Sequence, residues 1–147
     1  MPVTLPESKL TELDGYEMQD LVASILRAMG YHTRVSPPGA DGGVDIVASR
    51  DPLGVEQPVK VQVKAKPSTK SDVTEIRGLN GVLGQSERGI FVSLGGFTKD
   101  ALSEPAAARI VLVDAERLQA LLVAYYDRLD QDSKSLVPMR RLYFPLD

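Results

Sequence analysis

Three polar side chains in the first half of the chain have the types and spacing that phosphate-ester chemistry needs. Asp45 interrupts the apolar run VDIVA (44–48), and Gln62 and Lys64 follow in the alternating stretch VKVQVKAK (59–66). Residues two apart on a strand point to the same face, so we expect the Gln62 and Lys64 side chains to be neighbours. A carboxylate beside them could bind a hard divalent ion. An amine could orient water and neutralise developing charge.

The alternation in 59–66 has a simpler interpretation, because any half-buried strand shows it. Asp45 is the residue that favours a site. We expect its side chain to point to the face opposite that of Val44 and Ile46, at the edge of the sheet where the next strand delivers Lys64. The glycine-rich stretch GADGGVD (39–45) leads into Asp45, which adds to the case for a built site.

The composition restricts the chemistry of any metal site. The chain has 147 residues, enough for one domain, with 43% hydrophobic and 25% charged residues. It has no cysteine, and His32 is its only histidine, so a bound metal would rely on oxygen ligands, which suit magnesium, manganese or calcium. The sequence has no apolar run long enough to span a membrane, and its first residues do not resemble a secretory signal. We therefore expect a cytoplasmic protein.

The net charge of −3 argues against a globally basic nucleic-acid binder, so any contact with DNA must use local positive charge. Lys60, Lys64, Lys66 and Lys70 fall within eleven residues, and Arg77 follows. A solvated strand face is the alternative interpretation of these lysines.

Hydrophobic periodicity predicts a mixed sheet flanked by helices on both faces, an α/β fold in one domain. We expect the domain to span residues 10–130, after a polar lead-in (1–9) and before a tail or linker (131–147). The predicted strands are 31–36, 44–48, 59–66, 89–94 and 109–113, with a possible edge strand or docking segment at 140–145. The first predicted helix starts at Thr11 and ends at Gly30. Two more span 71–84 and 115–129, and a short helix is predicted after its cap, Thr98.

Five stretches, in order, carry a resemblance that extends from about Leu10 to Leu129. They are GYEMQDLVASILRAMGY, GADGGVDIVA, VKVQVKAK, RGIFVSLGGFTKDA and IVLVDAERLQALL. In these the sequence resembles the Mrr-type restriction endonuclease domain of the PD-(D/E)xK nuclease superfamily. The resemblance implies a restriction-endonuclease-like fold. It also implies a Mg²⁺- or Mn²⁺-dependent endonuclease that hydrolyses DNA in restriction or anti-phage defence.

The resemblance also assigns roles to individual residues. Asp45 matches the metal-binding aspartate, Gln62 the metal-supporting position of the next strand, and Lys64 the catalytic lysine. The matching active-site loop contains Asp41, Gly42 and Gly43. The expected contacts with DNA phosphates are Lys60, Lys66, Lys70, Thr98 and Lys99. Cleavage of both strands implies two such sites, hence a homodimer or a fused or partner recognition domain.

The sequence departs from the family pattern on the first helix, where many members carry a metal-binding glutamate. That position falls on Gln19, and Glu17 is a weaker substitute on the other flank of the apolar stripe. Three outcomes stay open: a weak metal site made by Asp45 with Gln19 and Gln62, a site completed by Asp41, or a non-catalytic module that binds DNA or mediates assembly. RNA as the substrate is a further alternative.

Overall fold

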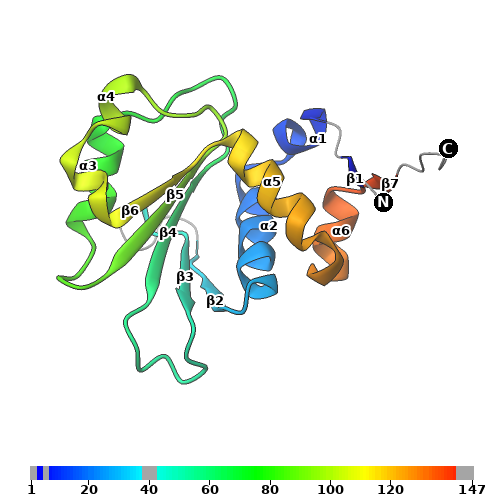
Figure 1. Ribbon diagram of the computed structural model, residues 1–147, viewed down its shortest axis with the longest axis horizontal. Helices are drawn as coiled ribbons and strands as arrows, with labels where there is room; N and C mark the ends of the chain where they lie inside the picture. The colour runs from blue at the N-terminus through cyan, green and yellow to red at the C-terminus, as the bar shows by residue number, and fades with distance from the viewer. Residues whose placement is uncertain (1–2, 5–6, 38–42, 142–147) are drawn as a thin grey trace, which may run out of the picture.

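The centre of the molecule is a five-stranded mixed sheet in the order β2-β3-β4-β5-β6 (Figure 1). The structure is a computed structural model that describes residues 3–4, 7–37 and 43–141. The antiparallel strands β2 and β3 pair next to β4, whereas β4, β5 and β6 run parallel. The strands are His32–Val35 (β2), Ile46–Ser49 (β3), Val59–Lys64 (β4), Arg88–Ser93 (β5) and Ile110–Val113 (β6). The predicted α/β architecture is confirmed.

Helices cover both faces of this sheet (Figure 1). On one face, α2 (Gly15–Ala28) and α5 (Ala115–Tyr125) share a core cluster with the inward side chains of β3 and β4. On the other, α3 (Val73–Gly81), α4 (Lys99–Leu102) and the 3₁₀ helix η2 (Pro105–Arg109) enclose a second cluster around Phe91. Each fully buried aliphatic or aromatic side chain stabilises the fold by about 1.5–3 kcal/mol, and both layers contribute such side chains.

The first helical segment is divided in two, which the apolar periodicity does not predict. A short helix, α1 (Glu7–Glu12), occupies part of the expected lead-in, and α2 begins after Asp14. The Asp14 carboxylate accepts a hydrogen bond from the Glu17 amide (2.8 Å), and the Glu17 carboxylate accepts one from the Asp14 amide (3.0 Å). This capping box satisfies backbone donors that would otherwise lack partners, and it fixes where α2 starts.

The segment expected to be a polar tail or linker continues the folded structure. After the 3₁₀ turn η3 (Tyr126–Arg128), residues Gln131–Leu136 form α6, which packs on α2. Asp130 caps α6 and forms an ion pair with Arg27 (2.6 Å), and Val137 is fully buried. The segment is polar because only one side of this short helix meets the core.

The chain ends of the described structure lie together. β7 (Arg140–Arg141) pairs antiparallel with β1 (Val3–Thr4) in a separate two-stranded sheet, so the first two residues of the predicted edge strand form a strand, but not at the edge of the central sheet. Positions 142–145 of that prediction lie outside the described residues. Across the described ranges, no helix has the length and apolar character required to cross a bilayer.

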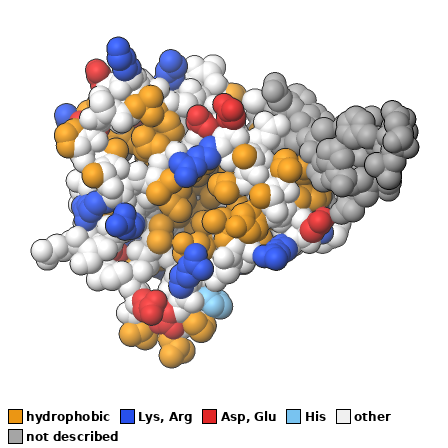
Figure 2. Space-filling model, in the orientation of Figure 1, with side chains coloured by type: hydrophobic (Ala, Val, Ile, Leu, Met, Phe, Trp, Pro, Cys, Tyr) orange, Lys and Arg blue, Asp and Glu red, His pale blue; other side chains and the backbone are white. Residues whose placement is uncertain are grey.

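Hydrophobic side chains gather over the middle of the face drawn in Figure 2. A mostly apolar pocket of 240 Å³ lies between α2, β6 and α5, bordered by Met29, Val111 and Leu121. The polar residues of the predicted site are not among those that line it.

Candidate active site

Asp45 lies where the chain enters the sheet, directly before β3. Its amide donates to the Val61 carbonyl (2.8 Å), and its carbonyl accepts from the Ser36 amide (2.8 Å). The expectation that Val44 and Ile46 share a face is wrong, because Val44 packs in the cluster under α3 and Ile46 in the cluster under α2. The chain crosses from one face to the other at Asp45, so this side chain emerges at the end of the sheet.

The Asp45 carboxylate is held by two neutral donors. Oδ2 accepts the Val63 amide (2.7 Å), and Oδ1 accepts the side-chain amide of Gln19 from α2 (3.0 Å). Burial of this half-buried carboxyl raises its pKa, and the bond from Val63 only partly opposes that effect. The structure therefore brings Gln19 and Asp45 together, around a carboxylate that a nearby cation would stabilise.

Gln62 lies against the glycine turn. A side chain at Gly43 would place its Cβ 3.4 Å from the Gln62 amide group, and Gly43 has φ +95°, a conformation that other residues rarely adopt. Glycine at this position therefore permits the turn against which Gln62 lies. Asp41 and Gly42 of the predicted loop lie outside the described residues.

Lys64, the last residue of β4, forms an ion pair with Glu75 on α3. The two side chains are each about a quarter exposed, at 26% and 24%. Glu75 is not among the residues predicted from the sequence. The pattern Asp72-x-x-Glu75 is a capping-box signature, which could have fixed Glu75 in the first turn of a helix following β4.

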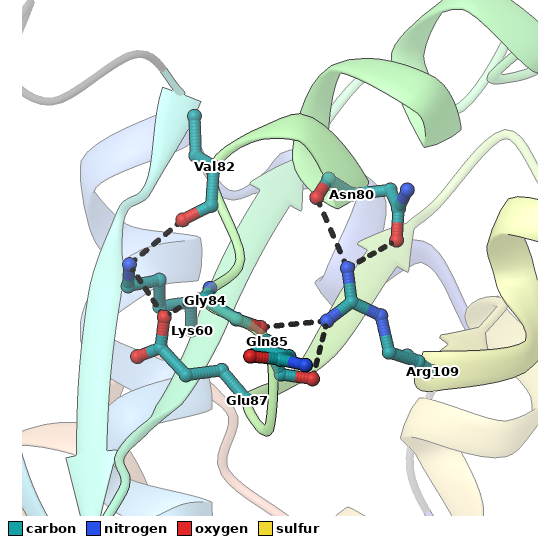
Figure 3. A network of polar contacts seen from close by, with 7 residues as sticks. All are labelled: Lys60, Asn80, Val82, Gly84, Gln85, Glu87 and Arg109. Atoms are coloured by element: carbon teal, nitrogen blue, oxygen red, sulfur yellow. Dashed lines mark hydrogen bonds and ion pairs between the residues drawn. The ribbon is translucent and has the colours of Figure 1, made fainter.

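Two predicted site residues have other partners. The Glu17 carboxylate belongs to the α2 capping box, and it lines a pocket with Asp20 and Asp130 that Asp45 does not share. Lys60 donates to the Val82 carbonyl (2.8 Å) and pairs with Glu87 (3.0 Å), so its ammonium is directed into the protein (Figure 3).

The remaining predicted DNA contacts follow the carboxyl ends of two parallel strands. Lys66 and Lys70 are exposed in the loop after β4, and Lys99 is exposed at the start of α4, after β5. The carboxyl ends of parallel strands meet at one edge of a sheet, so these lysines share the edge that carries Lys64. The Thr98 hydroxyl accepts the Ala101 amide (3.2 Å), which confirms it as the cap of α4.

The acidic residues near this edge are sparse. Within the described ranges, which exclude Asp41, no three acidic or histidine side chains are grouped so that they could hold a metal ion. Asp45, with the amide oxygens of Gln62 and Gln19, is the donor set that the described residues offer. One carboxylate with neutral oxygen donors suits a hard ion that keeps several of its waters.

A family model of Mrr type, described as restriction endonuclease, matches residues 10–122. The chain belongs to this family. One curated relative is the type IV methyl-directed restriction enzyme EcoKMrr of Escherichia coli K12, which is 33% identical over 123 residues. That match covers 78% of this chain and 40% of the relative, so the chain spans well under half of that enzyme's length.

Two solved structures share the fold. The DNA modification-dependent restriction endonuclease AspBHI superposes with a TM-score of 0.64 at 15% identity, over 88% of this chain and 37% of that chain. The MspJI restriction endonuclease, solved with a 27-mer oligonucleotide, superposes with a TM-score of 0.53 at 22% identity, over 82% of this chain and 31% of that chain. The restriction-endonuclease-like fold is thereby confirmed, and enzymes of this family generally use a divalent metal ion.

Proposed function

We propose that this domain is a metal-dependent endonuclease that hydrolyses DNA phosphodiester bonds at the end of β4, in restriction or anti-phage defence. The observation that carries the proposal is the half-buried Asp45 carboxylate, fixed by the Val63 amide on the strand that also presents Gln62 and Lys64. Membership of the family supports the reaction type, and the sequence motifs that carry the resemblance are the segments that form this site.

The side chains fit a weakly held Mg²⁺ or Mn²⁺ ion. Asp45 would supply the charged ligand, and Gln62 and Gln19 neutral amide oxygens. Gln19 can turn its amide so that the oxygen faces a cation, because its two ends have nearly the same shape. When bound, a divalent ion lowers the pKa of its water and stabilises charge on the phosphate.

Lys64 would act on the phosphate and the attacking water. An ammonium has three donors and no acceptor, and one donor is directed to Glu75. The other two can contact a phosphate oxygen and orient the water, neutralising the charge that develops as the ester is cleaved. Lys66, Lys70 and Lys99 would contact flanking phosphates, which position the duplex without reading its sequence.

A cleavage assay tests this proposal. Supercoiled and linear DNA are incubated with Mg²⁺ or Mn²⁺ and the wild type, Asp45→Ala or Lys64→Ala, with an oligoribonucleotide as a parallel substrate. We expect each substitution to reduce the cleavage rate by about 10²–10³-fold, the loss that follows removal of one preorganised electrostatic group. Lys66→Ala is the control for charge alone, and it should weaken DNA binding and its salt dependence rather than chemistry. Undiminished cutting by both Asp45→Ala and Lys64→Ala would show that the site lies elsewhere.

A second function, a module that binds DNA or mediates assembly without cutting it, is favoured by one observation. The helix and strand positions that could supply further carboxylates are Gln19 and Gln62. Calorimetry with Mn²⁺ separates the two functions: binding that strengthens when DNA is present supports the nuclease, and no binding with or without DNA supports the module. A homodimer or a partner recognition domain is part of the nuclease proposal, since double-strand cleavage needs two sites.

A further inference from the structure

Glu75 divides its carboxylate between two partners. One oxygen pairs with Lys64, and the other accepts the backbone amide of Asp72 (2.9 Å). The Asp72 side chain returns the interaction by accepting the Glu75 amide (3.1 Å). The side chain of Glu75 is therefore fixed at both oxygens, and it cannot leave Lys64 without disturbing the start of α3.

The start of α3 is itself anchored to the strand beside Lys64. The buried Ser71 hydroxyl donates to the Ser93 hydroxyl (2.9 Å), and Ser93 is the β5 residue paired in register with Lys64. The Ser71 carbonyl accepts the Thr98 amide (3.0 Å), and the Ser71 amide donates to Gly96 (2.9 Å). These bonds tie the loop before α3 to the loop after β5.

The same two loops touch backbone to backbone. A Cβ at Gly95 would lie 1.9 Å from the Thr69 carbonyl oxygen, so only glycine fits at that contact. The scaffold that carries Glu75 is therefore close-packed, and the geometry between Glu75 and Lys64 is set before any substrate arrives.

We propose that Glu75 is a positioning residue for Lys64, holding its ammonium at the end of β4 so that two of its three donors face the substrate phosphate and water. This inference rests on the proposed role of Lys64 in cleavage. Glu75 itself touches neither reacting atom. Its charge acts through Lys64, whose long side chain would otherwise sample several rotamers.

A purely structural role for Glu75 would require a different property of the side chain from the positioning of Lys64. The capping box needs only an oxygen acceptor at this position, and glutamine meets that need as well as glutamate. A partly exposed ion pair contributes little to stability. The negative charge of Glu75 is therefore dispensable for the fold, and it is the property that positioning of Lys64 requires.

Glu75→Gln separates these roles, because it keeps the cap and the side-chain length while it removes the charge. We expect an unchanged melting temperature, unchanged DNA affinity in Ca²⁺, and a single-turnover cleavage rate about 10–100-fold lower, the scale expected of a misplaced group. The matched control is Asp72→Ala, which removes the bond from the Glu75 amide to the Asp72 side chain. It leaves both bonds to the Glu75 carboxylate, from the Asp72 amide and from Lys64. It should lower the melting temperature and leave the cleavage rate, measured well below melting, unchanged.

Two further measurements keep the inference falsifiable. In a Lys64→Ala background, Glu75→Gln should cause no additional loss of cleavage, whereas an independent loss would overturn the positioning role. Acylation of lysines by an amine-reactive ester, followed by mass spectrometry, needs neither metal nor activity. Lys64 should react several-fold faster in Glu75→Gln than in the wild type, relative to the exposed Lys66 and Lys70.

The outcomes distinguish this inference from the proposed function. If Asp45→Ala and Lys64→Ala cut normally, the nuclease site is wrong, and the acylation rates still report whether Glu75 restrains Lys64. If those variants are inactive but Glu75→Gln cuts at the wild-type rate, the site stands and the positioning role is overturned. Equal acylation of Lys64 in the wild type and Glu75→Gln also overturns it.

Discussion

The two ends of the polar face of β4 carry the same pair of residue types in different surroundings. Lys60 pairs with Glu87 at one end, and Lys64 pairs with Glu75 at the other. The Glu87 side chain is 10% exposed and Glu75 is 24% exposed, while both lysines are 26% exposed. Sequence spacing alone gives these two lysines equivalent positions, so the difference between them comes from the groups around them.

At the Lys60 end, the ammonium contacts groups of the protein itself. Lys60 also donates to Val82, and the Glu87 carboxylate accepts the Gly84 amide. Arg109 continues the network by donating to the Gly84 carbonyl (2.6 Å) and to the Asn80 side chain (2.9 Å), closing the turn between α3 and β5 (Figure 3). Two of the three Lys60 donors are thus directed to protein groups, whereas one Lys64 donor is.

At the Lys64 end, the neighbouring Asp45 carboxylate has no positively charged partner among its hydrogen-bond donors. Asp45 has a raised pKa and only neutral partners, and Gln62 rests on a glycine turn. Functional sites are often less well compensated electrostatically than structural networks, because their groups must interact with something that comes from solution. The comparison teaches that the environment of a strand lysine, rather than its position in the motif, indicates its role.

Replacing each lysine with methionine gives the largest expected contrast. Lys64→Met should reduce cleavage by about 10²–10³-fold and change the free energy of unfolding by less than about 1 kcal/mol, because its pair is partly exposed. Lys60→Met should destabilise the fold by about 1–3 kcal/mol, because it leaves the buried Glu87 without its side-chain partner. Urea denaturation and cleavage rates below the melting range check both. Similar effects of the two substitutions on cleavage would break the comparison.

Asp45→Asn is expected to reduce cleavage by about 10²–10³-fold and to stabilise the metal-free fold at neutral pH. Asparagine can accept the Val63 amide and donate to Gln19 once the Gln19 amide turns over. Because folding raises the pKa of Asp45 above its ordinary 3.8, its favourable contribution is complete below that pH and is lost as the pH rises through the folded value. The stability gain of the variant should therefore vanish in acid.

Adding Mn²⁺ should reduce or reverse the stability difference between the wild type and Asp45→Asn, since an ion that binds only the wild type stabilises only the wild type. Thermal melting with and without the ion measures this effect. A gain that persists unchanged at saturating Mn²⁺ would contradict Asp45 as a metal ligand.

Glu87→Gln should show the opposite dependence on pH, with a smaller effect. Burial acts to raise the pKa of Glu87, but the bonds from the Gly84 amide and Lys60 outweigh it and lower the pKa below the ordinary 4.5. The stabilisation by this carboxylate is therefore present above pH 4.5 and is lost as the pH falls through the folded value. Urea denaturation between pH 3 and 7 should show the wild type losing its advantage over Glu87→Gln in acid, with cleavage unaffected at neutral pH.

Two glycine substitutions give the smallest contrast in stability. Gly43 and Gly54 have φ values of +95° and +70°, so alanine at either position costs roughly 1–2 kcal/mol of backbone strain. A Cβ at Gly43 would contact the Gln62 amide group at 3.4 Å, so the backbone strain at this position falls beside Gln62, whereas no heavy atom lies within 4 Å of a Cβ at Gly54. Gly43→Ala should therefore also reduce cleavage, and Gly54→Ala should not. Equal cleavage by the two variants would remove Gln62 and its turn from the site.

The architecture could be predicted from the sequence because its elements are strongly patterned. The apolar runs that form β5 and β6 and the alternating run that forms β4 are recognisable without a structure. At β4 the predicted strand is two residues too long, because Ala65 and Lys66 lie beyond its end. The break at Asp14 and the helix after Asp130 are harder to predict from the sequence, since both depend on a capping side chain rather than on periodicity.

The site was predictable to the extent that it lies in local motifs. Asp45, Gln62 and Lys64 stand in short stretches that carry the family resemblance. Glu75 and Glu87 are different, because each becomes relevant only when a tertiary contact brings it to a lysine on β4. For the same reason, the partners of Lys60 could not be predicted, because nothing near it in the sequence shows that Glu87 and Val82 bind its ammonium.

The packing of α6 on α2 has a consequence for the order in which the domain acquires its structure during synthesis. Asp130 and Arg27, which join these helices, are 103 residues apart in the chain. The residues proposed for catalysis and for positioning Lys64, from Gln19 to Glu75, leave the ribosome well before the segment that covers α2. Loops of that length close slowly compared with local contacts, so we expect the nascent chain to present its catalytic side chains on an unfinished scaffold. The nuclease would therefore become competent only after Val137 has been made and buried.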